Sequence, residues 1–253
     1  MPQLHAILCA LLLLAWSSVA TAQPRSEKLE FDVTWGYSDV AKMTLVRGCP
    51  RNGYTPAALT ARSRGAAEQL HAFEVRLDSF VASQLPLEGR TYIFEDGRPR
   101  SFRTRFGQKT GDTKVTKKFR KQETTLKLEL EHPTHDLLSW IFVLRNRKLS
   151  NGASYDYYVW DGWKLARITA TVGKPERVWT PAGTHDAYRI QIARRRLHHA
   201  GAKKYAPLRD TEHLATLWLS TSSAHIPVAL DFDAPVGTAK VRLTRSSIAT
   251  CSE

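Results

Sequence analysis

Hydrophobic and polar residues alternate along most of the chain with the two-residue period of β-strands. Over residues 29–35, Leu, Phe, Val and Trp fall on one side and Glu, Asp and Thr on the other, the pattern of a half-buried strand. Similar segments recur to the end of the chain. We expect strands over 29–35, 40–47, 57–64, 74–85, 92–95, 98–106, 124–131, 155–160, 163–172, 176–180, 185–193, 215–219, 226–232 and 238–248.

Two Asp-Gly pairs stand between these segments and predict tight turns. Asp96-Gly97 and Asp161-Gly162 each follow one strand segment and precede another. Glycine adopts the positive φ that a two-residue hairpin turn requires, so we expect a hairpin at each pair.

One segment has helical spacing instead. After Pro133, Thr134 is a predicted N-cap, and apolar residues then recur every three or four positions as far as Arg145. We expect a helix over 134–145 that packs on the sheet. About a dozen strands, one short helix and no βαβ rhythm predict a mainly β protein, built as a curved antiparallel sheet or an open barrel.

Residues 1–22 have the pattern of a secretory signal peptide. An apolar run over 6–19 ends in the small residues Ala20-Thr21-Ala22, so we expect cleavage after Ala22 and a periplasmic product. An uncleaved anchor is the weaker alternative, because a spanning helix needs roughly 20 apolar residues. Export would leave 23–253 as a single β domain and exclude nucleic acid as a partner.

Two cysteines, Cys49 and Cys251, remain after this cleavage. An isolated pair in an oxidising compartment favours a disulfide, which would join the end of the second strand to the last strand. A catalytic thiol is the alternative for Cys251, but the neighbouring residues offer no base.

The net charge of +13 comes from two segments. Residues 98–121 hold ten Lys or Arg and one acid, and residues 189–204 hold six and none. Such charges can simply keep a β protein soluble, or they can attract anionic lipid, glycolipid or polysaccharide. The candidate ligand-binding residues are Arg103, Arg105, Lys117, Lys118, Arg194, Arg195 and Arg196.

Aromatic residues are concentrated between Tyr155 and Trp163, where five occur within nine positions. Most of them should belong to the core. If the sheet curls, its concave side would form an apolar groove for an acyl chain or for an apolar segment of a partner. Basic residues at the rim would then bind an anionic head group.

Four residues between 131 and 136 could in principle bind zinc, namely Glu131, His132, His135 and Asp136. A strand end followed by a helix cap explains them better, and we expect no metal and no cofactor. The pair His198-His199 lies in a basic loop, where solvated histidines or a pH-sensitive anion contact are the two interpretations.

No motif indicates catalysis. The sequence has no Gly-x-Ser-x-Gly elbow for a hydrolase nucleophile and no glycine-rich phosphate loop. Paired carboxylates are recognised only by their distance in space. We therefore expect a protein that is not an enzyme.

Several turn and strand markers resemble, in order and spacing, the exported bacterial proteins of the domain of unknown function 3108 family. They are residues 31–36, 136–139, 144–145, Leu149 with Asn151-Gly152, and residues 180–184, 217–220, 226–228 and 235–237. The resemblance covers essentially the whole mature chain and implies an envelope β protein, similar in shape to half-barrel carriers of lipoproteins. It implies no reaction and no catalytic residue, and residues 221–225 depart from the family's more charged pattern.

These observations predict an exported protein that binds an amphiphilic or anionic component of the cell envelope in a groove of its sheet. The first alternative is a scaffold or assembly factor that holds another envelope protein at a sheet edge or on the basic surface. A hydrolase is the second alternative.

Overall fold

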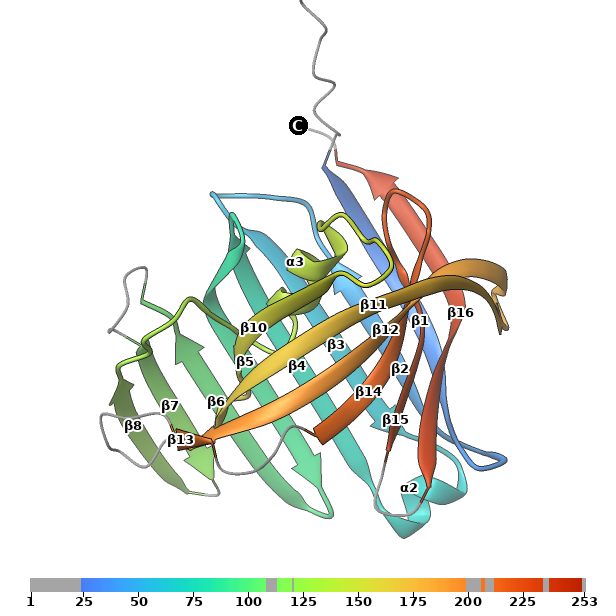
Figure 1. Cartoon of the computed structure of the whole chain (residues 1–253). Helices are drawn as coiled ribbons and strands as arrows, with labels where there is room; N and C mark the ends of the chain where they lie inside the picture. The colour runs from blue at the N-terminus through green and yellow to red at the C-terminus, as the bar shows by residue number, and fades with distance from the viewer. Residues whose placement is uncertain are drawn as a thin grey trace, which may run out of the picture.

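The computed structural model describes residues 24–107, 113–119, 121–198, 206–207, 212–233 and 237–251. Within these residues every strand joins one sheet (Figure 1). The strands are β1 (Arg25–Trp35), β2 (Ser38–Arg47), β3 (Thr55–Ser63), β4 (Phe73–Ala82), β5 (Leu85–Glu95), β6 (Arg98–Arg105), β7 (Thr113–Phe119), β8 (Gln122–Leu128), β9 (Thr134–His135), β10 (Ser154–Trp160), β11 (Leu165–Thr180), β12 (Gly183–His198), β13 (Ala206–Pro207), β14 (Glu212–Ser220), β15 (Pro227–Asp233) and β16 (Thr238–Thr250).

The sheet begins at β8, runs back strand by strand to β1, and continues through β16, β15, β14, β12, β11 and β10 to β9, while β13 pairs with β12. Its pairs are antiparallel apart from the short parallel pair of β9 and β10. The sheet curls so that β4–β8 lie opposite β10–β12 (Figure 1). Its two ends, β8 and β9, are not paired with each other, which confirms the prediction of a curved antiparallel sheet or open barrel.

The helix begins later than the spacing predicts. Helix α3 spans Ser139–Arg145, whereas Thr134–His135 form β9 beside Tyr158 and Val159, so Thr134 is not the N-cap. The short helix α2 (Ala66–Leu70) and strand β7 were not expected. The segments predicted at 163–172 and 176–180 form one strand, β11, with an irregularity between Val172 and Pro175.

Helix α3 lies inside the curved sheet and supplies much of its core (Figure 1). One side of the helix, with Trp140, Val143 and Leu144, packs on buried residues of β10, β11, β12 and β14. Phe142 packs with apolar residues of β1, β2 and β3. Because the helix fills the interior beside β1–β3, the open part of the concave face lies over β4–β8.

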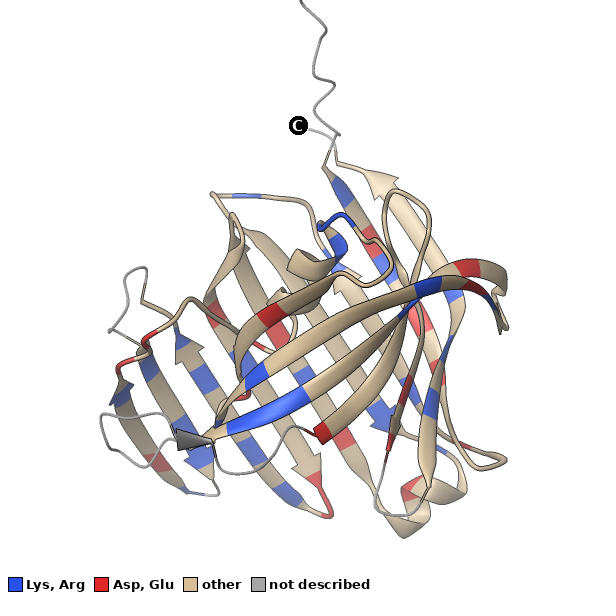
Figure 2. Cartoon of the chain, in the orientation of Figure 1, with Lys and Arg blue, Asp and Glu red and all other residues tan. Residues whose placement is uncertain are grey.

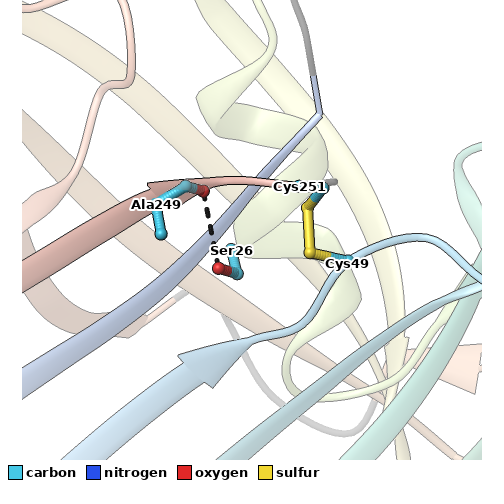
Figure 3. The surroundings of a disulfide bond; sticks show 4 residues. All are labelled: Ser26, Cys49, Ala249 and Cys251. Carbon is cyan, nitrogen blue, oxygen red and sulfur yellow. Dashed lines mark hydrogen bonds between the residues drawn. A yellow bond between two sulfur atoms is a disulfide. The ribbon is translucent and has the colours of Figure 1, made fainter. Parts of the chain in front are cut away.

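The disulfide between Cys49 and Cys251 is present, as the cysteine pair predicts (Figure 3). Cys49 follows β2 and Cys251 follows β16, the two strands that flank β1 in the sheet. The amide of Cys251 also donates to the carbonyl of Pro24, just before β1 begins. The bond therefore holds the start of β1 between its two neighbours.

A buried ion pair joins the end of α3 to the same corner of the sheet. Arg145 donates from both terminal nitrogens to the Glu27 carboxylate, at 2.5 and 2.7 Å. The two side chains are only 4% and 6% exposed. Arg145 also donates to the carbonyl of Ala224, which leaves the guanidinium well satisfied.

The predicted leader, residues 1–22, lies outside the described residues, and so does His199. No helix in the described part of the chain has the length and apolar character of a membrane span.

Candidate ligand-binding groove

A groove of about 900 Å³ opens on the concave face of β4–β8. This volume lies within the range of small-molecule sites, roughly 300–1,000 Å³. Most of its wall is apolar and comes from Val75, Leu77, Ile93, Phe102, Phe119, Leu126, Leu137 and Trp163.

The register of four adjacent strands builds the floor of this groove. Leu77 lies opposite Thr91, Thr91 opposite Phe102, and Phe102 opposite Lys117. Paired residues share one face of a sheet, so these side chains form a row across β4, β5, β6 and β7.

The hairpin turn between β10 and β11 forms a further wall. Gly162 has a φ of +94°, and a Cβ at this position would lie 2.8 Å from the Cβ of Phe102. Asp161 fixes the turn by accepting from the amides of Trp163 and Lys164, each at 2.6 Å. The turn thus packs closely against the groove floor and places the Trp163 ring edge to face with Phe102.

Lys117 brings a positive charge into this apolar setting. Its Nζ lies 3.9 Å from the centre of the Trp163 ring, a cation–π contact. Burial lowers the pKa of Lys117, and the carboxylate of Asp161 opposes the shift. The ammonium is thus partly stripped of water at the groove wall.

Arg100 supplies a second cation. It lies between Ile93 and Phe119 in register, and its Nη2 donates to Glu95 at 2.5 Å. Its Nε is buried and has no hydrogen-bond partner among the described residues. An unsatisfied buried donor of this kind is uncommon in folded proteins.

Two of the predicted basic residues border the groove. Lys117 lies opposite Phe102 on the groove face of β7, whereas Lys118 alternates with it and faces the other side of the sheet. Arg103 and Arg105 lie on the opposite face of β6, where both bind Glu88. These two arginines alternate with Phe102, as the sequence pattern indicates.

The second predicted basic cluster, Arg194 to Arg196, lies on β12 and does not line the groove. Arg194 and Arg196 pair with Glu212 at 2.6 and 3.4 Å, while Arg195 is exposed opposite Arg167. The role of this cluster in ligand binding stays a prediction.

The sequence analysis did not identify Leu77, Arg100 and Trp163 as groove residues.

Among the described residues, no group of three or more His, Cys, Asp or Glu side chains is arranged to hold a metal ion. His132 stacks on Tyr158, and His135 is buried with its Nδ1 3.4 Å from the Ser139 hydroxyl.

A model of the family described as "Protein of unknown function (DUF3108)" matches residues 30–244. This chain belongs to the DUF3108 family. Among solved structures, a β-barrel-like protein of domain of unknown function DUF1849 from Brucella abortus is similar, with a TM-score of 0.59 and 13% identity over 90% of this chain and 98% of that one. At this identity the similarity shows the fold alone. No curated protein matches the sequence.

One marker of the DUF3108 resemblance, residues 136–139, has a structural role. Asp136 Oδ1 accepts from the amides of Leu138 and Ser139, and Ser139 Oγ accepts from the amide of Asp136, so these reciprocal hydrogen bonds order the turn that leads into α3. Ser79 donates to Asp136 Oδ2 at 2.5 Å. A Cβ on Gly89 would lie 3.0 Å from this Oδ2, so the motif fastens α3 closely to β4 and β5.

His135, next to this turn, is expected to make the fold of the DUF3108 protein sensitive to acid. Burial, with a smaller effect of Arg147, lowers its pKa from 6.5 to about 4. As the pH falls, the unfolded chain therefore takes up a proton on His135 before the folded protein does. The stability contributed by neutral His135 is complete above pH 6.5 and is lost as the pH falls to 4. Between pH 7 and 4 we expect wild type to lose about 3 kcal/mol more unfolding free energy than His135→Gln, measured by urea unfolding. Parallel pH profiles for the two proteins would contradict this assignment.

Proposed function

We propose that this DUF3108 protein is exported to the periplasm and there binds an amphiphilic, anionic component of the cell envelope without altering it chemically. The alkyl part of the ligand occupies the groove on β4–β8. The anionic head lies at Lys117 and Arg100.

The observation that supports this proposal is the combination of apolar walls with two cations, the partly desolvated Lys117 and Arg100, which is paired with Glu95. Phe102 and Leu77 offer the kind of surface that excludes water from an alkyl chain. The Arg100 guanidinium and the Lys117 ammonium are donors suited to a phosphate or carboxylate. A purely apolar ligand would bring no anion to these two cations, and a small inorganic anion would leave the apolar walls exposed to water.

The chemistry of the groove favours binding over hydrolysis. Its described lining includes no Ser, Cys or His, the side chains from which nucleophile and base pairs are most often built. Asp161 is the one carboxylate in that lining, and its Oδ1 already accepts from two backbone amides.

Thr91→Trp is expected to block the groove, because Thr91 lies in the middle of the floor between Leu77 and Phe102. We expect this variant to bind dodecyl phosphate at least about tenfold more weakly than wild type, as measured by isothermal titration. The matched control is Tyr92→Trp, which adds bulk on the same strand but on the opposite face. Equal affinity for the two variants would overturn the proposed site.

Native mass spectrometry of the protein purified from its own envelope separates the proposal from its alternatives. A co-purified anionic amphiphile that Thr91→Trp lacks supports the proposal. A stoichiometric protein with no amphiphile would instead support a scaffold.

A further inference from the structure

The outer face of β5–β8, on the reverse side of the groove, is strongly basic. Six exposed cations and two acids alternate there with the groove residues (Figure 2 shows the blue segments on these strands). The cations are Arg90, Arg103, Arg105, Lys114, Lys118 and Lys127, and the acids are Glu88 and Glu123. We call this surface the outer basic face.

Three of these cations stand directly opposite one another. Arg105 pairs in register with Lys114, and Lys114 pairs with Lys127, so one row of like charges crosses three adjacent strands. Like charges opposite each other on neighbouring strands destabilise a sheet, because their side chains lie close together. On a surface whose charges serve solubility alone, positive and negative side chains are usually interspersed.

The acids on this face do not neutralise it. Glu88 accepts from Arg90 at 2.6 Å, from Arg103 at 2.7 Å and from Arg105 at 3.3 Å, so one carboxylate serves three guanidinium groups. Lys114 and Lys127 form no ion pair with the described residues. The row therefore keeps its positive charge and attracts an external anion.

We propose that the outer basic face binds the surface of an anionic lipid bilayer. Its charges are spread over four strands, about 15 Å across at the usual strand spacing, which suits an array of head groups better than one small anion. Tyr92 lies on the same face two residues from Arg90 and is 37% exposed, an aromatic of the kind enriched at membrane interfaces. This inference goes beyond the groove and does not depend on its ligand.

Sedimentation with vesicles of phosphatidylcholine, with and without phosphatidylglycerol, tests the proposal. The variant Arg105→Gln/Lys114→Gln/Lys127→Gln is expected to bind the anionic vesicles about a hundredfold more weakly than wild type, since each basic residue near such a surface contributes about fivefold. The matched control, Lys42→Gln/Lys174→Gln/Lys240→Gln, removes three exposed positive charges elsewhere and should change binding by only a few fold.

An equal loss in both triple variants would overturn the proposal, since only net charge would then matter. Absence of wild-type binding to anionic vesicles would overturn it too, as would tighter binding to soluble heparin than to those vesicles. The groove-blocking Thr91→Trp should sediment like wild type, and the outer triple variant should still bind dodecyl phosphate. Failure of one proposal is therefore distinguishable from failure of the other.

Discussion

Replacing both Cys49 and Cys251 with alanine is expected to lower the free energy of unfolding by about 4 to 5 kcal/mol. The disulfide closes a sequence separation of 202 residues, and so restricts most of the unfolded chain. In the chain-entropy model the stabilisation grows with the length of the closed loop. A loss of this size is a large share of the 5–15 kcal/mol typical of a folded domain.

Guanidinium unfolding monitored by tryptophan fluorescence measures the loss. Reduced wild type is the control, since it lacks the bond but keeps both side chains, and it should match the double variant. A difference below about 1 kcal/mol between oxidised wild type and the double variant would show that the bond does little for the fold.

Glu27→Gln is expected to lower the free energy of unfolding by about 3 to 5 kcal/mol, because it leaves the buried charge of Arg145 without its carboxylate. Arg47 increases the effect. Its guanidinium and that of Arg145 lie 5.5 and 5.4 Å from the Phe142 ring centre, and both burial and Arg145 lower the pKa of Arg47. Without Glu27 the two cations repel each other in the same corner. Urea unfolding at neutral pH measures the change.

The double variant Glu27→Leu/Arg145→Met separates the cost of leaving Arg145 unpaired from the loss of the ion pair itself. Removing both charges also removes the desolvation cost, so the double variant should recover most of the stability that Glu27→Gln loses. A double variant as unstable as the single one would show that the ion pair itself, and not the unpaired charge, accounts for the effect.

The positions of the two hairpins at Asp-Gly pairs were predicted from the turn preferences of neighbouring residues. Asp96-Gly97 forms a two-residue turn in which both residues have positive φ. Asp161-Gly162 also connects paired strands, but the loop has four residues, 161–164, because Trp160 pairs with Leu165. These turns depend on residues next to each other in the chain, which is why sequence reasoning could place them.

Elements defined by distant contacts were missed. Strand β7 has lysine at three of seven positions, and one of them, Lys117, takes an inward position that the period-2 pattern reserves for apolar residues. Strand β9 exists only because residues 134–135 lie beside Tyr158 and Val159, more than twenty positions later. The helix spacing after Pro133 gave no sign of that pairing.

The sequence predicted a groove on a concave apolar face with basic residues at its rim, but it did not predict which residues line the groove. Lys117 was among the expected residues. Trp163 was not, because it reaches the groove only when the turn after β10 folds back over β6. Arg100 was not either, although it lies two residues from Phe102 and so shares its face of β6. The alternation on β6 already put Arg103 and Arg105 on the reverse face from Phe102, so the register of β5–β8 divides the basic segment between groove and outer face.

A crystal structure of the protein with dodecyl phosphate would show whether the groove is the binding site. We expect the alkyl chain to lie along Leu77 and Phe102 and the phosphate to be within hydrogen-bond distance of Lys117 Nζ or of the Arg100 guanidinium. An empty groove at saturating dodecyl phosphate, or an alkyl chain bound elsewhere, would contradict this expectation.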